Sequence, residues 1–152
     1  MTRSAPASLP YGVTHEVAGA CICLHAQRAA RALARRFDTA LRPFGLTNGQ
    51  FSLLMSLNRA EPPTVGSVAD LLAMDRTTLT ANLKPLERRG LVRSTTDEAD
   101  RRVRRLELTQ EGMALLVAAV PVWRREHAAI EGDLPDAERL RADLRRISAR
   151  VS

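Results

Sequence analysis

Aromatic residues, long apolar runs and a secretory signal are scarce or absent in this chain of 152 residues. Phe, Trp and Tyr make up 3% of the sequence, so leucine, alanine and valine must supply most of the core. No segment approaches the roughly 18 apolar residues that cross a membrane, and the N-terminus lacks the basic start and apolar run of a signal peptide. We therefore expect a cytoplasmic protein with no membrane partner, long enough for one domain with a core of its own.

Cysteine is also rare, and the two that occur, Cys21 and Cys23, stand two positions apart. On one intact helix their side chains would point about 200° from each other, so a disulfide between them is not expected. Reduced thiols agree with a cytoplasmic location. Cys21 and His25 share a helical face, but no second ligand pair with zinc spacing appears, so no metal is expected.

Motifs of catalysis are missing as well. The chain has no glycine-rich phosphate loop, no nucleophile elbow and no carboxylate pair beyond ordinary helix surface charges. A redox enzyme would need a resolving thiol or a cofactor motif, and the sequence offers neither. We therefore expect no enzymatic activity and no cofactor.

Positive charge, in contrast, is abundant and concentrated. The formal net charge is +6 and the isoelectric point is near 10.8. Nine basic and four acidic residues lie between positions 76 and 105, so this fifth of the chain carries +5 of the total. Lys84 is the one lysine among 23 basic residues, and arginine suits bidentate contacts with phosphate and guanine. The clustering favours a nucleic acid as partner over a generally basic surface.

The N-terminal half is expected to be helical after a flexible tail at residues 1–14, which hold two prolines and a glycine. From about His15 to Arg42, apolar residues recur every three or four positions, which predicts a long amphipathic helix. Thr47 and Gln50 form a capping box for a second helix, and Thr64 is suited to cap a third. The stripe of the long helix consists of Ile22, Ala26, Ala29, Leu33, Phe37 and Leu41.

Two further helices are expected at the C-terminal end. Thr109 is suited to cap the first, and Pro121 is expected to bend it. In the last helix the apolar residues recur at spacings of three and four, at Ala137, Leu140, Leu144, Ile147 and Val151. A single small lobe cannot bury the stripes of both the first and the last helix, so we expect them to pair in a twofold dimer.

Between these helices, the stretch 65–105 has the order helix, tight turn, polar-faced helix, glycine, strand, charged hairpin and strand. Asp75 is suited to cap the second of these helices, which extends from about Arg76 to Arg89. The strands are expected at 91–94 and 103–108. This order is the layout of a winged helix-turn-helix, which places one helix in the DNA major groove and a hairpin beside it.

The second helix is expected to bury its leucines and to leave its threonines for DNA. Threonine hydroxyls contact phosphates or base edges, and arginines at a hairpin tip can lie in the narrower minor groove. Pro85 removes one backbone hydrogen bond from this helix. The expected DNA contacts are Arg76, Thr77, Thr78, Thr80, Ala81, Asn82, Lys84, Asp100, Arg101 and Arg102.

Taken together, these motifs resemble the multiple antibiotic resistance regulator (MarR) family of bacterial winged-helix regulators. The resemblance extends from about His15 to Val151. Its motifs are Leu46-Thr47-x-x-Gln50-Phe51, Val68-Ala69-x-x-Leu72-x-x-Asp75-Arg76-Thr77-Thr78-Leu79-Thr80, Leu86-Glu87-Arg88-Arg89-Gly90-Leu91-Val92, Asp97-x-x-Asp100-Arg101-Arg102 and Leu108-Thr109-x-x-Gly112. The sequence departs from the family at Ala73, where glycine is frequent, and at Pro85.

The resemblance implies a mainly α fold with a small β-hairpin wing, and a homodimer that binds pseudo-palindromic double-stranded DNA. It implies a DNA-binding lobe at 47–109 and dimerisation helices at 15–46 and 110–152. It also implies that Arg76–Arg89 is the recognition helix, that Arg102 enters the minor groove and that Asp100 braces Arg102. The function expected is a sequence-specific transcriptional regulator, acting as a repressor. A non-specific architectural DNA binder is the alternative, but its basic arms and apolar wedges are absent.

Two signals for release from DNA remain open. Cys23 resembles in its placement the reactive cysteine of organic-hydroperoxide regulators, although the tyrosines that surround that thiol are not present, and Cys21 and Cys23 are also consistent with small packed residues. The other signal is a small apolar or aromatic acid bound between the dimer helices and the lobe. Its expected pocket residues, which are equally consistent with core packing, are Phe37, Phe51, Met55, Trp123 and His127.

Overall fold

The computed structural model describes residues 8–150 and has the predicted mainly α fold with one hairpin. None of the described helices is long and apolar enough to cross a membrane. In chain order the elements are α1 (Tyr11–Ala20), α2 (Ile22–Leu41), the short 3₁₀ helix η1 (Arg42–Phe44), α3 (Asn48–Leu57), α4 (Val65–Leu71), α5 (Arg76–Arg88), β1 (Val92–Thr96), β2 (Arg104–Leu108), α6 (Gln110–Gly132) and α7 (Ala137–Arg150).

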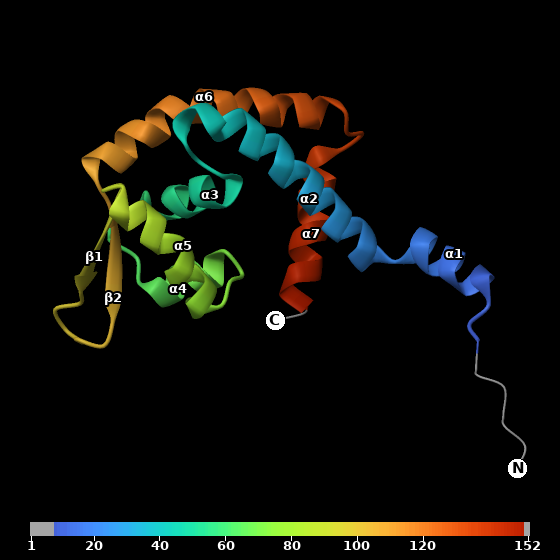
Figure 1. Ribbon diagram of the computed structural model, residues 1–152, viewed down its shortest axis with the longest axis horizontal. Helices are drawn as coiled ribbons and strands as arrows, with labels where there is room; N and C mark the ends of the chain where they lie inside the picture. Colours follow the sequence, from blue (N-terminus) through green and yellow to red (C-terminus); the bar gives the residue numbers. More distant parts are fainter. Residues whose placement is uncertain (1–7, 151–152) are drawn as a thin grey trace, which may run out of the picture.

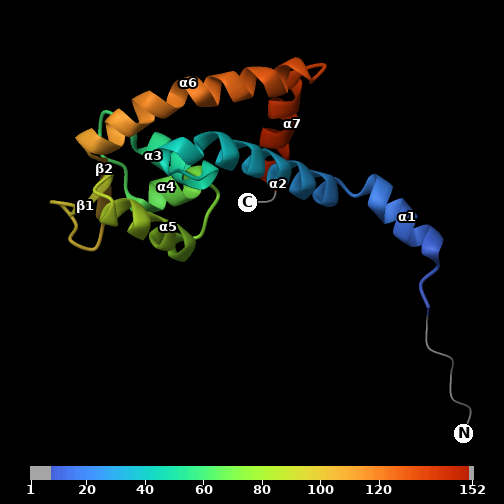
Figure 2. The same ribbon diagram turned by 45° about the horizontal axis from the view of Figure 1, so that its top comes forward.

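These elements form a lobe and a set of outer helices (Figures 1 and 2). The hairpin and helices α3, α4 and α5 gather under one end of α6, while α1 extends from the far end of α2, away from the hairpin. Helix α2 packs against both α6 and α3. The core between them is rich in leucine, and its largest fully buried side chains are Leu41, Leu53, Leu54, Leu79, Leu86, Leu106 and Val68.

Side-chain caps start the helices where the sequence predicts them. Thr47 and Gln50 form the expected reciprocal capping box, with distances of 3.2 Å and 3.1 Å between the side-chain oxygens and the backbone nitrogens. The hydroxyls of Thr64 and Thr109 accept from backbone nitrogens at the starts of α4 and α6, each at 3.0 Å. These caps satisfy amide groups that would otherwise lack partners.

The prediction of one helix starting at His15 is wrong. Helix α1 starts earlier, at Tyr11, so part of the predicted tail is helical, and residues 1–7 lie outside the described range. Cys21 separates α1 from α2 with an extended backbone (φ −73°, ψ 104°), and its sulfur accepts a hydrogen bond from the Leu24 amide at 3.4 Å. We expected Cys21 and Cys23 to lie on one intact helix that holds their thiols apart. Cys21 instead lies before α2, so this constraint is absent.

Both hairpin strands start one residue later than predicted; β1 also ends two residues later, at Thr96, while β2 ends at Leu108 as predicted. The Leu91 amide donates to the carbonyl of Leu86, and the Leu91 carbonyl accepts from the Thr109 amide, so Leu91 lies in the turn after α5 rather than in β1. The antiparallel register pairs Val92 with Leu108 and continues to the pair of Thr96 and Arg104. Pro85 lies within α5, which continues past it to Arg88, and Pro121 lies within α6.

Candidate DNA interface

Helix α5 is capped at its N-terminus by Asp75, whose carboxylate accepts two hydrogen bonds from Thr78. One oxygen accepts from the Thr78 amide at 2.8 Å and the other from the Thr78 hydroxyl at 2.6 Å. The hydroxyl bond and then the amide bond lower the pKa of Asp75, which keeps the carboxylate ionised at the positive end of the helix. The buried face of α5 is Leu79, Leu83 and Leu86. The side chains predicted to contact DNA are therefore on its exposed or half-buried faces.

Asp97 organises the turn of the wing, which comprises β1, β2 and residues 97–103. Its carboxylate accepts from the amides of Ala99 and Asp100, each at 2.9 Å, and from the Arg105 side chain. The Arg105 bond, followed by the Asp100 amide, lowers the pKa of Asp97. Arg105 also donates to the carbonyl of Pro62 at 2.9 Å. An ionised Asp97 therefore fixes the turn and, through Arg105, ties it to the segment before α4.

The wing tip presents Arg102 to solvent on a fixed backbone. Oδ1 of Asp100 accepts from the Arg102 amide at 2.9 Å and from its Nε at 3.3 Å. The Arg102 side chain is nonetheless 92% exposed. Its Nε is therefore bonded to Asp100 while the rest of the guanidinium faces solvent. This is the arrangement that an arginine needs if it is to enter a groove without first being ordered.

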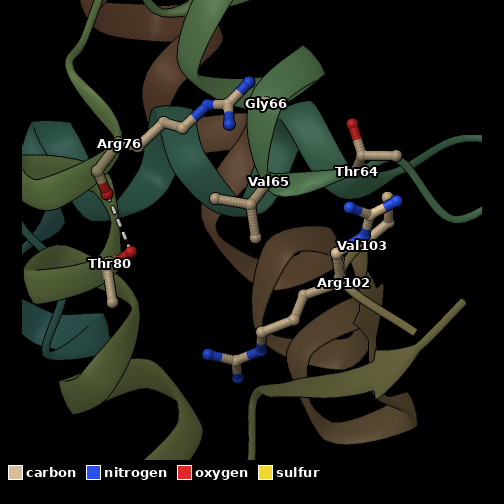
Figure 3. Close-up of a pocket in the computed structure, with 8 residues that line it drawn as sticks. Thr64, Val65, Gly66, Arg76, Thr80, Arg102 and Val103 are labelled. Carbon is tan, nitrogen blue, oxygen red and sulfur yellow. Dashed lines mark hydrogen bonds between the residues drawn. The ribbon is translucent and has the colours of Figure 1, made fainter. Parts of the chain in front are cut away.

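A cleft of about 360 Å³ opens between α5, the start of α4 and the wing. Figure 3 shows Arg76 extending from α5 toward Gly66 of α4, with Arg102 reaching in from the wing. A Cβ on Gly66 would lie 3.1 Å from Nη2 of Arg76, so glycine gives this guanidinium its position. The residues that line the cleft are Thr64, Val65, Gly66, Arg76, Thr80, Arg102, Val103 and Arg104.

The structure brings together some of the predicted contact residues and separates others. Arg76 and Thr80 line both this cleft and a neighbouring hollow on α5 that also includes Thr77, Ala81 and Lys84. Asn82 lines neither hollow, and its Nδ2 donates instead to the sulfur of Met74 at 3.9 Å. Sequence reasoning missed five lining positions. Thr64 was seen only as a cap and Arg104 only as part of the basic cluster, while Val65, Gly66 and Val103 carried no chemical signal.

Four of the five residues expected to line a ligand pocket, all but Met55, form one cluster of rings. Ring centroids are 6.3 Å apart for Phe51 and Trp123, 4.4 Å for Trp123 and His127, and 5.6 Å for His127 and Phe37. An adjacent cavity of about 470 Å³ is lined by Phe51, Ser52, Met55, Ser56, Leu71, Leu72, Val120, Trp123 and Arg124. Phe37 and His127 belong to the ring cluster but do not line the cavity.

The two cysteines differ in exposure. Cys21 is half-buried, while Cys23 is exposed and accepts a hydrogen bond from Gln27 Nε2 at 3.2 Å. Across the break, His25 Nε2 lies 3.1 Å from the carbonyl oxygen of Gly19. Within residues 8–150, no group of three His, Cys, Asp or Glu side chains is placed to hold a metal ion.

Comparison with known proteins identifies the family. The sequence model of the MarR family matches residues 46–103. The HTH-type transcriptional regulator PecS of Dickeya dadantii is 30% identical over 129 residues, which cover 82% of this chain and 75% of PecS. The organic hydroperoxide resistance transcriptional regulator of Bacillus subtilis is 30% identical over 102 residues, which cover 67% of this chain and 68% of that protein.

A solved structure extends the likeness to nearly the whole fold. The transcriptional regulator MosR of M. tuberculosis, crystallised in complex with DNA, matches with a TM-score of 0.80 and 40% identity, covering 86% of this chain and 96% of MosR. This chain therefore belongs to the MarR family of winged helix-turn-helix, DNA-binding transcriptional regulators. The family resemblance predicted from the sequence is confirmed.

Proposed function

We propose that this protein is a dimeric, sequence-specific repressor that reads double-stranded DNA with α5 and the wing. The observation that carries the proposal is the cleft lined by Arg76, Arg102 and Arg104. Winged-helix proteins place one helix in the major groove and a hairpin in the neighbouring minor groove, so the phosphate strand between the two grooves must pass between them. Three guanidiniums at that position supply the charge that a phosphate strand needs.

The remaining predicted residues then have distinct roles. Thr77, Ala81 and Lys84 share a hollow with Arg76 and Thr80 on α5, which is the face offered to the major groove. Arg101 and Arg102 extend from the wing toward the minor groove, with Asp100 orienting Arg102. Thr78 and Asn82 lie on an adjoining face of α5. Contacts to phosphate fix the position of the helix, and contacts to base edges select the sequence.

The outer helices supply the dimer interface in this proposal. Helix α1 has no buried residue, and in α2 the predicted apolar stripe is buried at Phe37 and Leu41 but exposed at Ile22 (68%). Helix α7 likewise exposes Leu140, Leu144 and Ile147. Pairing these surfaces in a twofold dimer buries them and sets two recognition helices about one DNA turn, ~34 Å, apart. The lobe at 47–109 and the flanking dimerisation segments at 15–46 and 110–152 follow from this division.

The experiment is a binding titration with DNA from upstream of the protein's own gene, at several salt concentrations. Counterion release predicts that log K falls with log salt by roughly 0.9 for each phosphate neutralised. Unrelated DNA of the same length is the control for specificity. Equal affinity for both DNAs, or an affinity that does not change with salt, contradicts the proposal. The same titration with the two half-sites moved apart by half a turn should show weak binding, because a dimer holds its helices at fixed spacing.

The signal that releases DNA is proposed to be a small apolar or aromatic acid. The cavity of about 470 Å³ has the size of a small-molecule site, and Arg124 on its rim is suited to a carboxylate. Its walls come from α3, α4 and α6, so an occupant touches both the lobe and the long helix. Aromatic carboxylates that weaken DNA binding by the wild type but not by Trp123→Ala would support this signal, and failure of a broad set of such acids would contradict it.

Oxidation of Cys23 is the second candidate signal, favoured by its exposure and by the likeness to the organic hydroperoxide regulator. A sulfenic acid would add a polar group beside the break between α1 and α2. Organic hydroperoxide should then release DNA from the wild type but not from Cys23→Ser. Equal DNA binding before and after oxidation would leave the ligand signal alone. We further propose that the protein acts in the cytoplasm and catalyses no reaction.

A further inference from the structure

The threonines on the exposed side of α5 differ in how their hydroxyl protons are used. The Thr78 hydroxyl lies 2.6 Å from a carboxylate oxygen of Asp75, and the Thr80 hydroxyl lies 2.7 Å from the carbonyl oxygen of Arg76. A hydroxyl has one proton to donate. A backbone carbonyl carries no proton, and neither does the Asp75 carboxylate, because its lowered pKa keeps it ionised. In both bonds the threonine hydroxyl must therefore be the donor. Among the residues that the structure describes, Thr77 has no hydrogen-bond partner for its hydroxyl.

We propose that Thr78 and Thr80 meet DNA only as hydrogen-bond acceptors and methyl groups, and that Thr77 is the threonine of α5 that donates. The inference rests on the proposed DNA-binding function and deepens it by assigning each hydroxyl as a hydrogen-bond donor or acceptor toward DNA. Thr78 and Thr80 each use their single proton within α5 or its cap, which leaves only oxygen lone pairs for an outside partner.

The chemistry of the major groove turns this assignment into base selection. The donors there are the amino groups of adenine and cytosine, whereas guanine and thymine present acceptors, and thymine adds a methyl group. Thr80, which lines both hollows beside α5, can therefore bond only to an amino group or pack its methyl on thymine. Phosphate oxygens and guanine are acceptors, so they are matched by Thr77.

The test compares valine and serine variants at the three positions. Valine keeps the shape of threonine without the hydroxyl, and serine keeps the hydroxyl without the methyl. The wild type first enriches its preferred DNA from a random pool, and this DNA is then synthesised in modified forms. One set removes donors: single adenines or cytosines lack their amino groups. A second set removes acceptors: single purines lack N7, or single phosphates are made neutral. A third set replaces single thymines with uracil. Unchanged midpoints of thermal unfolding show that each variant is folded.

Thr77→Val should bind the enriched DNA about tenfold more weakly, as expected for a lost bond to a charged group. It should also become insensitive to loss of one N7 or one phosphate charge, while Thr77→Ser behaves as wild type. Thr80→Val or Thr78→Val should lose sensitivity only to removal of an amino group. Thr80→Ser or Thr78→Ser should lose the response to uracil.

Three results overturn the inference. The first is a Thr78→Val or Thr80→Val protein that becomes insensitive to loss of an acceptor, because that hydroxyl then donates to DNA. The second is a Thr77→Val protein with wild-type affinity. The third is the absence of any amino-group or methyl response at both Thr78 and Thr80. A wild type that enriches no sequence contradicts the proposed function itself, so the two failures are distinguishable.

Discussion

The DNA-binding lobe and the outer helices of this protein are built on different principles. The lobe closes its own core, with Leu54, Leu79 and Leu106 fully buried. Helices α1 and α7, in contrast, leave large apolar side chains exposed, with Val17 at 54% and Leu144 at 47%. A chain that buries one region internally and leaves another open is folded as half of an assembly. The difference teaches that the stability of the lobe belongs to one chain, whereas the arrangement of two lobes belongs to the dimer.

The strongest test of this contrast is Leu144→Arg in α7. A charge on the open apolar face should separate the chains, because a buried unpaired guanidinium is costly. DNA with two half-sites should then bind two to four orders of magnitude more weakly, since linked recognition helices gain that much from effective concentration. Light scattering measures the size and titration the affinity. Arg146→Ala, about 200° around the same helix, is the matched control. A Leu144→Arg protein that remains dimeric would contradict the division.

The second test breaks the lobe instead. A Cβ on Gly112, at the start of α6, would lie 2.2 Å from the carbonyl oxygen of Leu91 and 2.8 Å from Cδ1 of Leu108. Since a backbone oxygen cannot turn aside, Gly112→Ala should lower the free energy of unfolding by about 1–3 kcal/mol, measured by denaturant titration. Gly132→Ala lies at the other end of α6 with nothing within 4 Å, and should cost no stability. Equal stability of the two variants would rule out this packing.

The third test keeps both regions folded and removes one DNA contact. Arg102→Ala should weaken binding to most sequences by roughly 1–3 kcal/mol, because a minor-groove arginine responds to groove width more than to base identity. The control is Arg93→Ala, because Arg93 lies on the same hairpin but is paired with Glu107. Titration of several DNA sequences checks both. Unchanged affinity of Arg102→Ala would show that the wing does not contact DNA.

A fourth test uses pH together with a substitution at Asp97 to probe the wing. The Arg105 and Asp100 bonds lower the folded pKa of Asp97 below its unfolded value, so the folded state favours the ionised form. The stability this contributes is fully present above the unfolded pKa of about 3.9 and is lost as pH falls through the lower, folded value. The difference in unfolding midpoint between wild type and Asp97→Asn should therefore shrink on acidification. Glu98→Gln, at the exposed position next to it, is the matched control. A constant difference would mean that Asp97 does not act through its charge.

The smallest expected effect is at Ala73, between α4 and α5. Its φ of 51° lies in the left-handed region, where a Cβ is strained. Ala73→Gly should raise the free energy of unfolding by about 0.5–1 kcal/mol, the relieved strain less the greater freedom of glycine in the unfolded chain. Ala118→Gly, in the middle of α6, should instead lower it by about 1 kcal/mol. If both substitutions destabilise equally, the turn is not strained.

Local signals in the sequence predicted most of the fold, because caps and apolar periodicity act over a few residues. The capping box of Thr47, the cap at Asp75 and helix α5 itself were found in this way. The break at Cys21 was not, since a cysteine sulfur is a poor and rarely used cap and the surrounding residues suit a helix. The cleft at Gly66 could not be predicted either: it exists because α4, α5 and the wing meet, and a residue without a side chain leaves no local sign of that.

The link between the wing and the segment before α4 has a mechanical consequence. Leu106 donates its amide to the carbonyl of Pro63 at 2.9 Å, and Arg105 holds the carbonyl of Pro62. These bonds join β2 to residues 62–63, just before α4, so the wing and the pair of helices α4 and α5 form one unit rather than two hinged parts. If α5 and the wing read DNA as proposed, we expect the wing to stay with α5 when DNA is released. Release would then come from a change in the distance between the two lobes of the dimer.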